Sequence, residues 1–235
     1  MDKNTSRQAL RLAGENKNIF AAVGIHPHNA RRLDKKQLLW FEEKINHPRV
    51  VGLGEIGLDY YYDNSSRNLQ KQMLAQFLRL ARITSVPVII HLRPEKNSSP
   101  TSRCRPVFRD LFELLDLEGG HKLCGLFHCF AGNQKELHLA GKYRFFYSAA
   151  GNITFPRSEN LRKTFMKIRR DRLLIETDSP YMSPTTFRGK QNHPFRVKNV
   201  LEKLSELYSV PEEILADKIN NNTRRLFGEK LIPCD

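Results

Sequence analysis

The chain has 235 residues, 40% of them hydrophobic, and this length and composition fit one large α/β domain with a sizeable core. No apolar run approaches the roughly 20 residues of a membrane span, no hydrophobic leader follows Met1, and the four cysteines form no CxxC pair. We therefore exclude a membrane-spanning protein and a disulfide-stapled secreted one, and we expect an intracellular protein, cytoplasmic or nuclear. The formal net charge of +14 favours a nucleic-acid partner, and it equally fits a solvated basic surface because the basic residues are spread along the chain.

Short runs of apolar and β-branched residues alternate with longer segments of helical period. This alternation is typical of βα units around a parallel sheet. We predict strands at Ile19–Ile25, Val50–Ile56, Val86–His91, Lys122–His128, Arg144–Ala150 and Arg172–Thr177. The sequence therefore predicts an α/β fold of the barrel kind.

The segments between these runs predict helices with one apolar stripe facing the sheet. The stripes are Leu69, Met73, Phe77 and Leu80 after the second run, and Phe108, Leu111, Phe112 and Leu115 after the third. Asn133, with Glu136 three residues later, predicts a capped helix start. We expect a single domain over 1–235, with a barrel portion over about 1–190 and two closing helices over about 195–228.

Residue types that bind metals stand at the ends of four predicted strands. Glu55, His91 and His128 lie at or next to the ends of their runs, and Asp178 follows the last run. One such histidine is more often a hydrogen-bonded structural residue, but the carboxyl ends of parallel barrel strands meet at one rim. Four of them together indicate a metal site. Imidazole with carboxylate suits zinc, manganese, cobalt or nickel, whereas oxygen ligands favour magnesium, so the metal stays open.

Several neighbouring residues have competing explanations. His28 either caps the turn after Pro27 or takes a functional role. Glu176 is expected to face away from the ligands, in a buried ion pair or hydrogen bond, and Cys129 is expected to face away from the metal as well. The tyrosines at 60–62 either stack on bases or pack against the rim of the barrel.

The ordered motifs resemble one known family. They are GIHPH at 24–28, GEIGLDY at 54–60, IHLR at 90–93, HCFAG at 128–132 and ETDSPY at 176–181. Together they resemble the TatD-like deoxyribonucleases over nearly the whole chain. The resemblance implies a distorted TIM barrel of the metallo-dependent hydrolase (amidohydrolase) type and two divalent ions, Mg, Mn or Zn, in the complete family site. It also implies exonucleolytic or endonucleolytic hydrolysis of single-stranded DNA or duplex ends.

The resemblance also implies roles for individual residues. Glu55 bridges two metal ions, and His91 and His128 complete one of the two sites. Asp178 belongs to the other site and orients or deprotonates the attacking water, so that Glu55 and Asp178 are the implied catalytic residues. The residues implied to face substrate phosphates are His26, Arg93 and Arg188.

One family feature is missing from the sequence. Members begin with a strand carrying Asp-x-His-Cys-His or a close variant, whereas the first thirty residues here resemble the family's second helix and third strand. We therefore expect a barrel truncated at its N-terminus by about two strands, in which the site of Glu55 is complete and that of Asp178 lacks two ligands. Two alternatives to a nuclease stay open, together with the oligomeric state: a non-catalytic form that binds nucleic acid or a full-length partner, and a metal-dependent hydrolase of another ester or amide.

Overall fold

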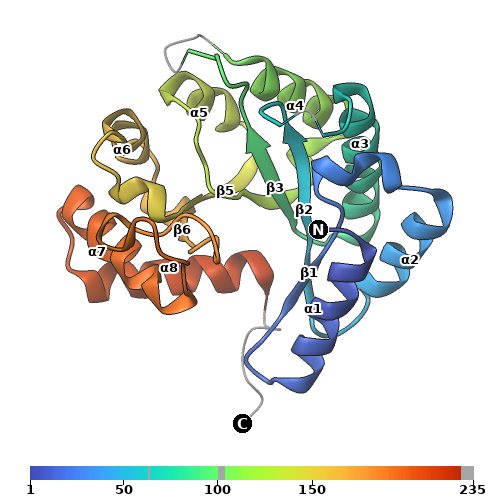
Figure 1. Cartoon of the computed structure of the whole chain (residues 1–235), viewed down its shortest axis with the longest axis horizontal. Coiled ribbons are helices and arrows are strands. Elements are labelled where there is room, and N and C mark those ends of the chain that lie inside the picture. Colours follow the sequence, from blue (N-terminus) through green and yellow to red (C-terminus); the bar gives the residue numbers. More distant parts are fainter. Residues whose placement is uncertain (63, 100–103, 229–235) are drawn as a thin grey trace.

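A parallel sheet forms the centre of the structure, a computed structural model that describes residues 1–62, 64–99 and 104–228 (Figure 1). Its strands are β1 (Ala21–Val23), β2 (Val50–Asp59), β3 (Val88–Arg93), β4 (Cys124–Phe127), β5 (Arg144–Ala149) and β6 (Leu173–Ile175). Successive strands pair with each other, in the order β1 to β6. All six predicted strands are thus present, in the predicted parallel arrangement. The parts of the predicted domain at 63, 100–103 and 229–235 lie outside the described residues.

Helices connect successive strands and surround the sheet (Figure 1). They are α1 (Lys3–Glu15), α2 (Lys35–Ile45), α3 (Arg67–Thr84), α4 (Pro106–Leu117), α5 (Gln134–Ala140), α6 (Glu159–Phe165), α7 (Val197–Tyr208) and α8 (Glu212–Phe227). The last two lie beside β6, within the range of about 195–228 where two closing helices were expected. None of the helices in the described part of the chain is both long and apolar enough to cross a membrane.

The predicted apolar stripes form the contact between helices and sheet. In α3, Met73 and Phe77 are buried, and Phe77 packs edge-on against Phe41 of α2 with ring centroids 5.3 Å apart. Leu69, at the start of the same stripe, is 40% exposed instead. The core therefore spans the helices and the sheet as one cluster.

The strands at the two edges of the sheet each have one neighbour. Within the described residues β1 pairs with β2 and β6 pairs with β5, so the sheet is a linear series rather than a closed ring. The expectation that this chain lacks about two N-terminal strands of the family barrel stays a prediction.

A buried ion pair ties the start of α4 to the start of α5. Asn133 and Glu136 form the predicted capping box, each side chain accepting a hydrogen bond from the other's backbone N–H. Glu136 is fully buried and also accepts hydrogen bonds from the backbone and the guanidinium of Arg105. Arg105 in turn donates to the carbonyl of Ala131. This network fixes the loop that follows β4.

We expect Glu136→Gln to lower the free energy of unfolding by about 3 kcal/mol, because the guanidinium of Arg105 would stay buried without its counter-charge. Urea denaturation followed by circular dichroism measures the difference. The control is Glu113→Gln, which removes an exposed carboxylate 3.9 Å from Arg109 and is expected to cost less than about 0.5 kcal/mol. Equal losses of stability in the two variants would contradict the role assigned to the buried pair.

Candidate metal centre

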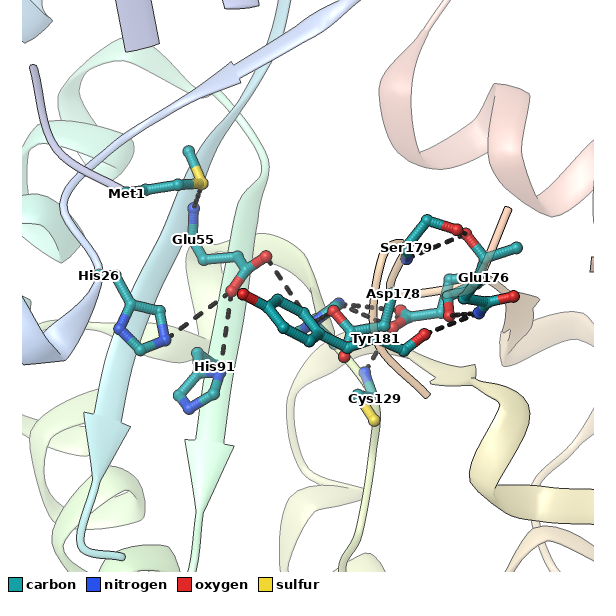
Figure 2. A network of polar contacts seen from close by, with 12 residues as sticks. Met1, His26, Glu55, His91, Cys129, Glu176, Asp178, Ser179 and Tyr181 are labelled. Atoms are coloured by element: carbon teal, nitrogen blue, oxygen red, sulfur yellow. Dashed lines mark hydrogen bonds and ion pairs between the residues drawn. The ribbon is translucent and has the colours of Figure 1, made fainter. Parts of the chain in front are cut away.

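The candidate site is a cavity of about 910 Å³ at the carboxyl ends of the strands. Glu55, His91, His128 and Asp178 all line it, as the sequence predicted. Figure 2 shows the carboxylate of Glu55 pointing toward His26 and His91, with Asp178 and Glu176 on the facing wall. The fold therefore brings together the residues that the motifs singled out.

Two of the four residues do not end their strands, contrary to the prediction. Glu55 lies inside β2 and His91 lies inside β3, because the backbone after Ile56 continues to pair, with Asp59 opposite Arg93. An irregularity in the register between residues 53 and 56 occurs where Glu55 leaves the regular alternation of the strand. His128 and Asp178 do follow the ends of β4 and β6.

Close backbone contact holds β2 and β3 together beside the site. Gly57 lies opposite His91 and has φ of +143°, a conformation that side chains with a Cβ rarely adopt. A Cβ at Gly57 would lie 1.9 Å from the carbonyl oxygen of His91. Glycine at this position therefore allows the strand that carries Glu55 to approach the strand that carries His91.

The loops that present His128 and Asp178 contain backbone in the left-handed region. Cys129 has φ of +43° and Asp178 has φ of +56°. Such conformations cost about 1–3 kcal/mol for most residues, although aspartate tolerates them better, and they cluster at functional sites. Hydrogen bonds fix both loops: the N–H of Phe130 donates to the carbonyl of Ser148, and the N–H of Tyr181 donates to that of Asp178.

The donor atoms of Glu55, His91 and His128 are spaced for a metal ion. Oε2 of Glu55 lies 3.8 Å from Nδ1 of His91, and Oε1 lies 3.7 Å from Nε2 of His128. Two ligand atoms about 2.1 Å from a tetrahedral ion are about 3.4 Å apart. A small movement of these side chains would therefore bring their donor atoms to the spacing that one ion requires. Asp178 Oδ1 lies 3.5 Å from Nε2 of His128. The residues fit a divalent ion, and one carboxylate with two imidazoles suits zinc, manganese, cobalt or nickel.

The electrostatics of the cavity favour a cation at His128. Burial lowers its pKa, but the carboxylates of Glu176, Asp178 and Glu55 outweigh burial and hold the pKa well above its usual range. His128 thus binds a proton in the metal-free protein at pH values where an ordinary histidine is neutral. A divalent ion would supply positive charge to these carboxylates in place of that proton.

Metal affinity is expected to rise with pH, because an ion must displace the proton of His128. Below the raised pKa, each pH unit lost weakens apparent binding by about tenfold, and above it the affinity levels off. Calorimetric titration with zinc in buffers of different ionisation enthalpy measures the protons released. Binding near pH 7 that releases no proton would contradict this expectation.

His26 enters the cavity as a neutral imidazole. Burial, together with the neighbouring His91 and His28, lowers its pKa to about 2. Its Nδ1 accepts a hydrogen bond from the backbone N–H of His28, so the proton sits on Nε2, 4.0 Å from Glu55 Oε2. The turn after Pro27 is therefore capped by His26, and the explanation of His28 as its cap is wrong.

Arg93 lies at the cavity wall against two tyrosines. Its guanidinium is 4.4 Å from the ring centre of Tyr61 and 4.7 Å from that of Tyr62. Tyr62 is 48% exposed, whereas Tyr60 is buried and donates its hydroxyl hydrogen to Asp110. Of the three tyrosines, only Tyr61 and Tyr62 line the cavity.

Arg188, the third predicted phosphate contact, does not line the cavity with His26 and Arg93. Arg188 lies on the segment between β6 and α7, and its guanidinium is 4.1 Å from the ring centre of Phe155. Its predicted role therefore gains no support from the position of its side chain.

Glu176 contacts a predicted ligand from behind. The predicted ion pair or hydrogen bond is present, because its carboxylate oxygens lie 2.9 and 3.0 Å from Nδ1 of His128. The predicted orientation away from the ligands was wrong, since β6 ends at Ile175 and strand alternation does not extend to Glu176.

Two further residues of the site carried no assigned role in the sequence. Asp59 is 1% exposed and lies within hydrogen-bond distance of His28 and His91. Met1 accepts the backbone N–H of His26 at its carbonyl, and its Sδ lies 3.4 Å from the backbone nitrogen of Glu55 (Figure 2). Asp59 could have been suspected as the second carboxylate, after Glu55, in a segment that is otherwise apolar, but no local signal marks Met1.

Comparisons with known proteins agree with this geometry. A family model described as TatD related DNase matches residues 1–228. The chain is 34% identical over 226 residues to the uncharacterized metal-dependent hydrolase YabD of Bacillus subtilis, covering 96% of this chain and 84% of that one. It is 32% identical over 216 residues to the uncharacterized metal-dependent hydrolase YcfH of Escherichia coli K12, covering 92% and 76%.

A solved structure extends the agreement to the fold. The TatD homolog YjjV of Escherichia coli K12 superposes with a TM-score of 0.85 at 27% identity, covering 97% of this chain and 83% of that one. This similarity and the parallel sheet confirm the predicted TIM-barrel-like fold of the metallo-dependent hydrolase type. The chain belongs to the TatD family of metal-dependent hydrolases.

Proposed function

We propose that this protein hydrolyses phosphodiester bonds of DNA with a divalent metal ion held by Glu55, His91 and His128. The observation that carries the proposal is the convergence of these donors with Asp178 and Arg93 in one cavity. When bound, the ion would polarise a phosphoryl oxygen and stabilise the charge that develops on it.

The side chains of the chain supply the remaining functions. Asp178 offers a carboxylate oxygen in the cavity that can orient a water molecule and accept its proton. Arg93 presents a guanidinium that can bind a phosphate in bidentate fashion, and its contacts with Tyr61 and Tyr62 limit its movement. His26 can donate a hydrogen bond from Nε2.

Single-stranded DNA, or a frayed duplex end, suits the wall of this cavity best. The ring of Tyr62 is half exposed beside Arg93, and such a pair can stack on a base while it binds the adjacent phosphate. Lys96 adds a second positive charge 5.2 Å from the ring centre of Tyr61. The net charge of +14 attracts a polyanion to the protein more strongly than a neutral amide.

Digestion of end-labelled DNA tests the proposal. Single-stranded and duplex substrates are incubated with Mg²⁺, Mn²⁺ or Zn²⁺ and with EDTA, and we expect release of label that needs the ion and is faster on single strands. A phosphate diester and a carboxylate ester of nitrophenol are run in parallel. Hydrolysis of the carboxylate ester alone would contradict the proposed nuclease activity and favour a metal-dependent hydrolase of another ester. DNA binding without metal-dependent cleavage would favour the non-catalytic alternative.

A further inference from the structure

We propose that Asp59 and Glu176 are positioning residues that select opposite ring nitrogens for metal binding, Nδ1 of His91 and Nε2 of His128. The inference rests on the metal centre of the proposed function and assigns a role to two buried carboxylates outside its three ligands.

Asp59 faces the side of His91 that points away from Glu55. Its Oδ2 lies 3.1 Å from Nε2 of His91 and 2.9 Å from Nε2 of His28, while Oδ1 accepts the backbone N–H groups of Tyr61 and Tyr62. An ionised carboxylate only accepts hydrogen bonds, so it requires the proton of His91 on Nε2. Nδ1 of His91 is then a free lone pair, 3.8 Å from Oε2 of Glu55.

The position and charge of Asp59 are themselves fixed. Gln70, which is fully buried, accepts the backbone N–H of Asp59 at 2.7 Å and donates to its carbonyl at 3.0 Å. The two oxygens of Asp59 face two backbone N–H groups and two imidazole nitrogens, which is the environment of an ionised acceptor. With Oδ1 held by the backbone N–H groups, Oδ2 cannot turn away from His91.

Glu176 acts on His128 from the opposite nitrogen. Its Oε2 lies 3.0 Å from Nδ1 of His128 and also accepts the backbone N–H of Cys129. The proton of a neutral His128 is thereby held on Nδ1. Nε2 is left facing the cavity, 3.7 Å from Oε1 of Glu55 and 3.5 Å from Oδ1 of Asp178.

The Asp59–His91 and Glu176–His128 contacts both turn a ring-nitrogen lone pair toward Glu55. The rings of His91 and His128 are 6.4 Å apart between centroids and lie on either side of Glu55. With the wrong tautomer, either ring would point an N–H at the ion instead of a lone pair. Partners of this kind behind a metal-binding histidine commonly change metal affinity by 10–100-fold.

Asparagine at position 59 gives a sharp test. The amide oxygen of Asp59→Asn would stay on the N–H groups of Tyr61 and Tyr62, so its NH₂ would face His91. His91 would then accept at Nε2 and carry its proton on Nδ1, toward Glu55. We expect the tautomer of His91 to reverse in the metal-free variant and zinc affinity to fall by about 10–100-fold. Glu176→Gln, which weakens the acceptor behind Nδ1 of His128, is expected to lower zinc affinity by a similar factor.

Long-range ¹H–¹⁵N NMR of histidine-labelled protein reads the tautomers, and competition with a chelating dye reads zinc affinity. The matched control is Asp110→Asn, which removes a carboxylate bonded to Tyr60 and Lys71 and contacts no histidine of the site. Zinc-loaded wild-type protein with Nδ1 of His91 and Nε2 of His128 ligated supports the inference, even if the variants fail to fold or DNA is not cleaved. Ligation of His91 through Nε2, or an unchanged His91 tautomer in folded Asp59→Asn, overturns it.

Discussion

The Glu55→Gln variant is expected to lose divalent-metal affinity by more than about 100-fold and to lose metal-dependent DNA hydrolysis with it. Glu55 is the only carboxylate of its three-residue donor group, and its two oxygens face different histidines, His91 and His128. An amide keeps one weaker acceptor and turns an NH₂ donor toward the other imidazole. The loss should therefore exceed the 10–100-fold typical of a residue behind a ligand. Zinc competition and cleavage of end-labelled DNA measure the two effects.

The matched control for this variant is Glu43→Gln on α2. Glu43 is largely exposed and pairs with Lys44 on the surface, so both metal affinity and cleavage should stay at wild-type levels. Wild-type zinc affinity in Glu55→Gln would remove Glu55 from the metal centre. Wild-type affinity for metal with lost cleavage would give it a role in the reaction alone.

The Asp178→Asn variant is expected to separate catalysis from metal binding. Asp178 can accept a proton at Oδ1, whereas the asparagine amide cannot, so we expect cleavage to slow by about 10²–10⁴-fold. The donors of Glu55, His91 and His128 remain, and zinc affinity should change by less than about tenfold. Single-turnover cleavage at saturating metal, with zinc titration of the same preparation, measures both quantities.

Asp171→Asn is the corresponding control. Asp171 forms a bidentate surface pair with Arg169 away from the cavity, and its replacement should leave cleavage unchanged. Cleavage by Asp178→Asn at the wild-type rate would exclude Asp178 as the proton acceptor. An equal loss of cleavage in both variants would show that the effect is not specific to the site.

Local patterns predicted most of the fold, because they depend on neighbours along the chain. Apolar runs marked the six strands, and Asn133 with Glu136 marked the start of α5 through a capping box that needs no distant partner. The positions of Glu55 and Asp178 near strand ends predicted that they meet, because the carboxyl ends of parallel strands lie at one rim, and both residues line the cavity.

The features that local patterns missed depend on pairing between distant segments. β2 extends to Asp59 because β3 continues to offer partners, and no periodicity in the sequence reports on a neighbouring strand. The orientation of Glu176 follows from the end of β6 at Ile175, which is a boundary rather than a pattern. The contact of Arg105 with Glu136 likewise joins residues 31 positions apart.

The position of Met1 has a practical consequence for producing the protein. Its carbonyl and its thioether are held against His26 and Glu55, and it lines the cavity. An affinity tag joined to the Met1 amine would begin inside this cavity, beside Glu55 and His26. A histidine tag there would offer its own imidazoles to the ion. Fusion partners are better attached beyond α8, which ends at Phe227.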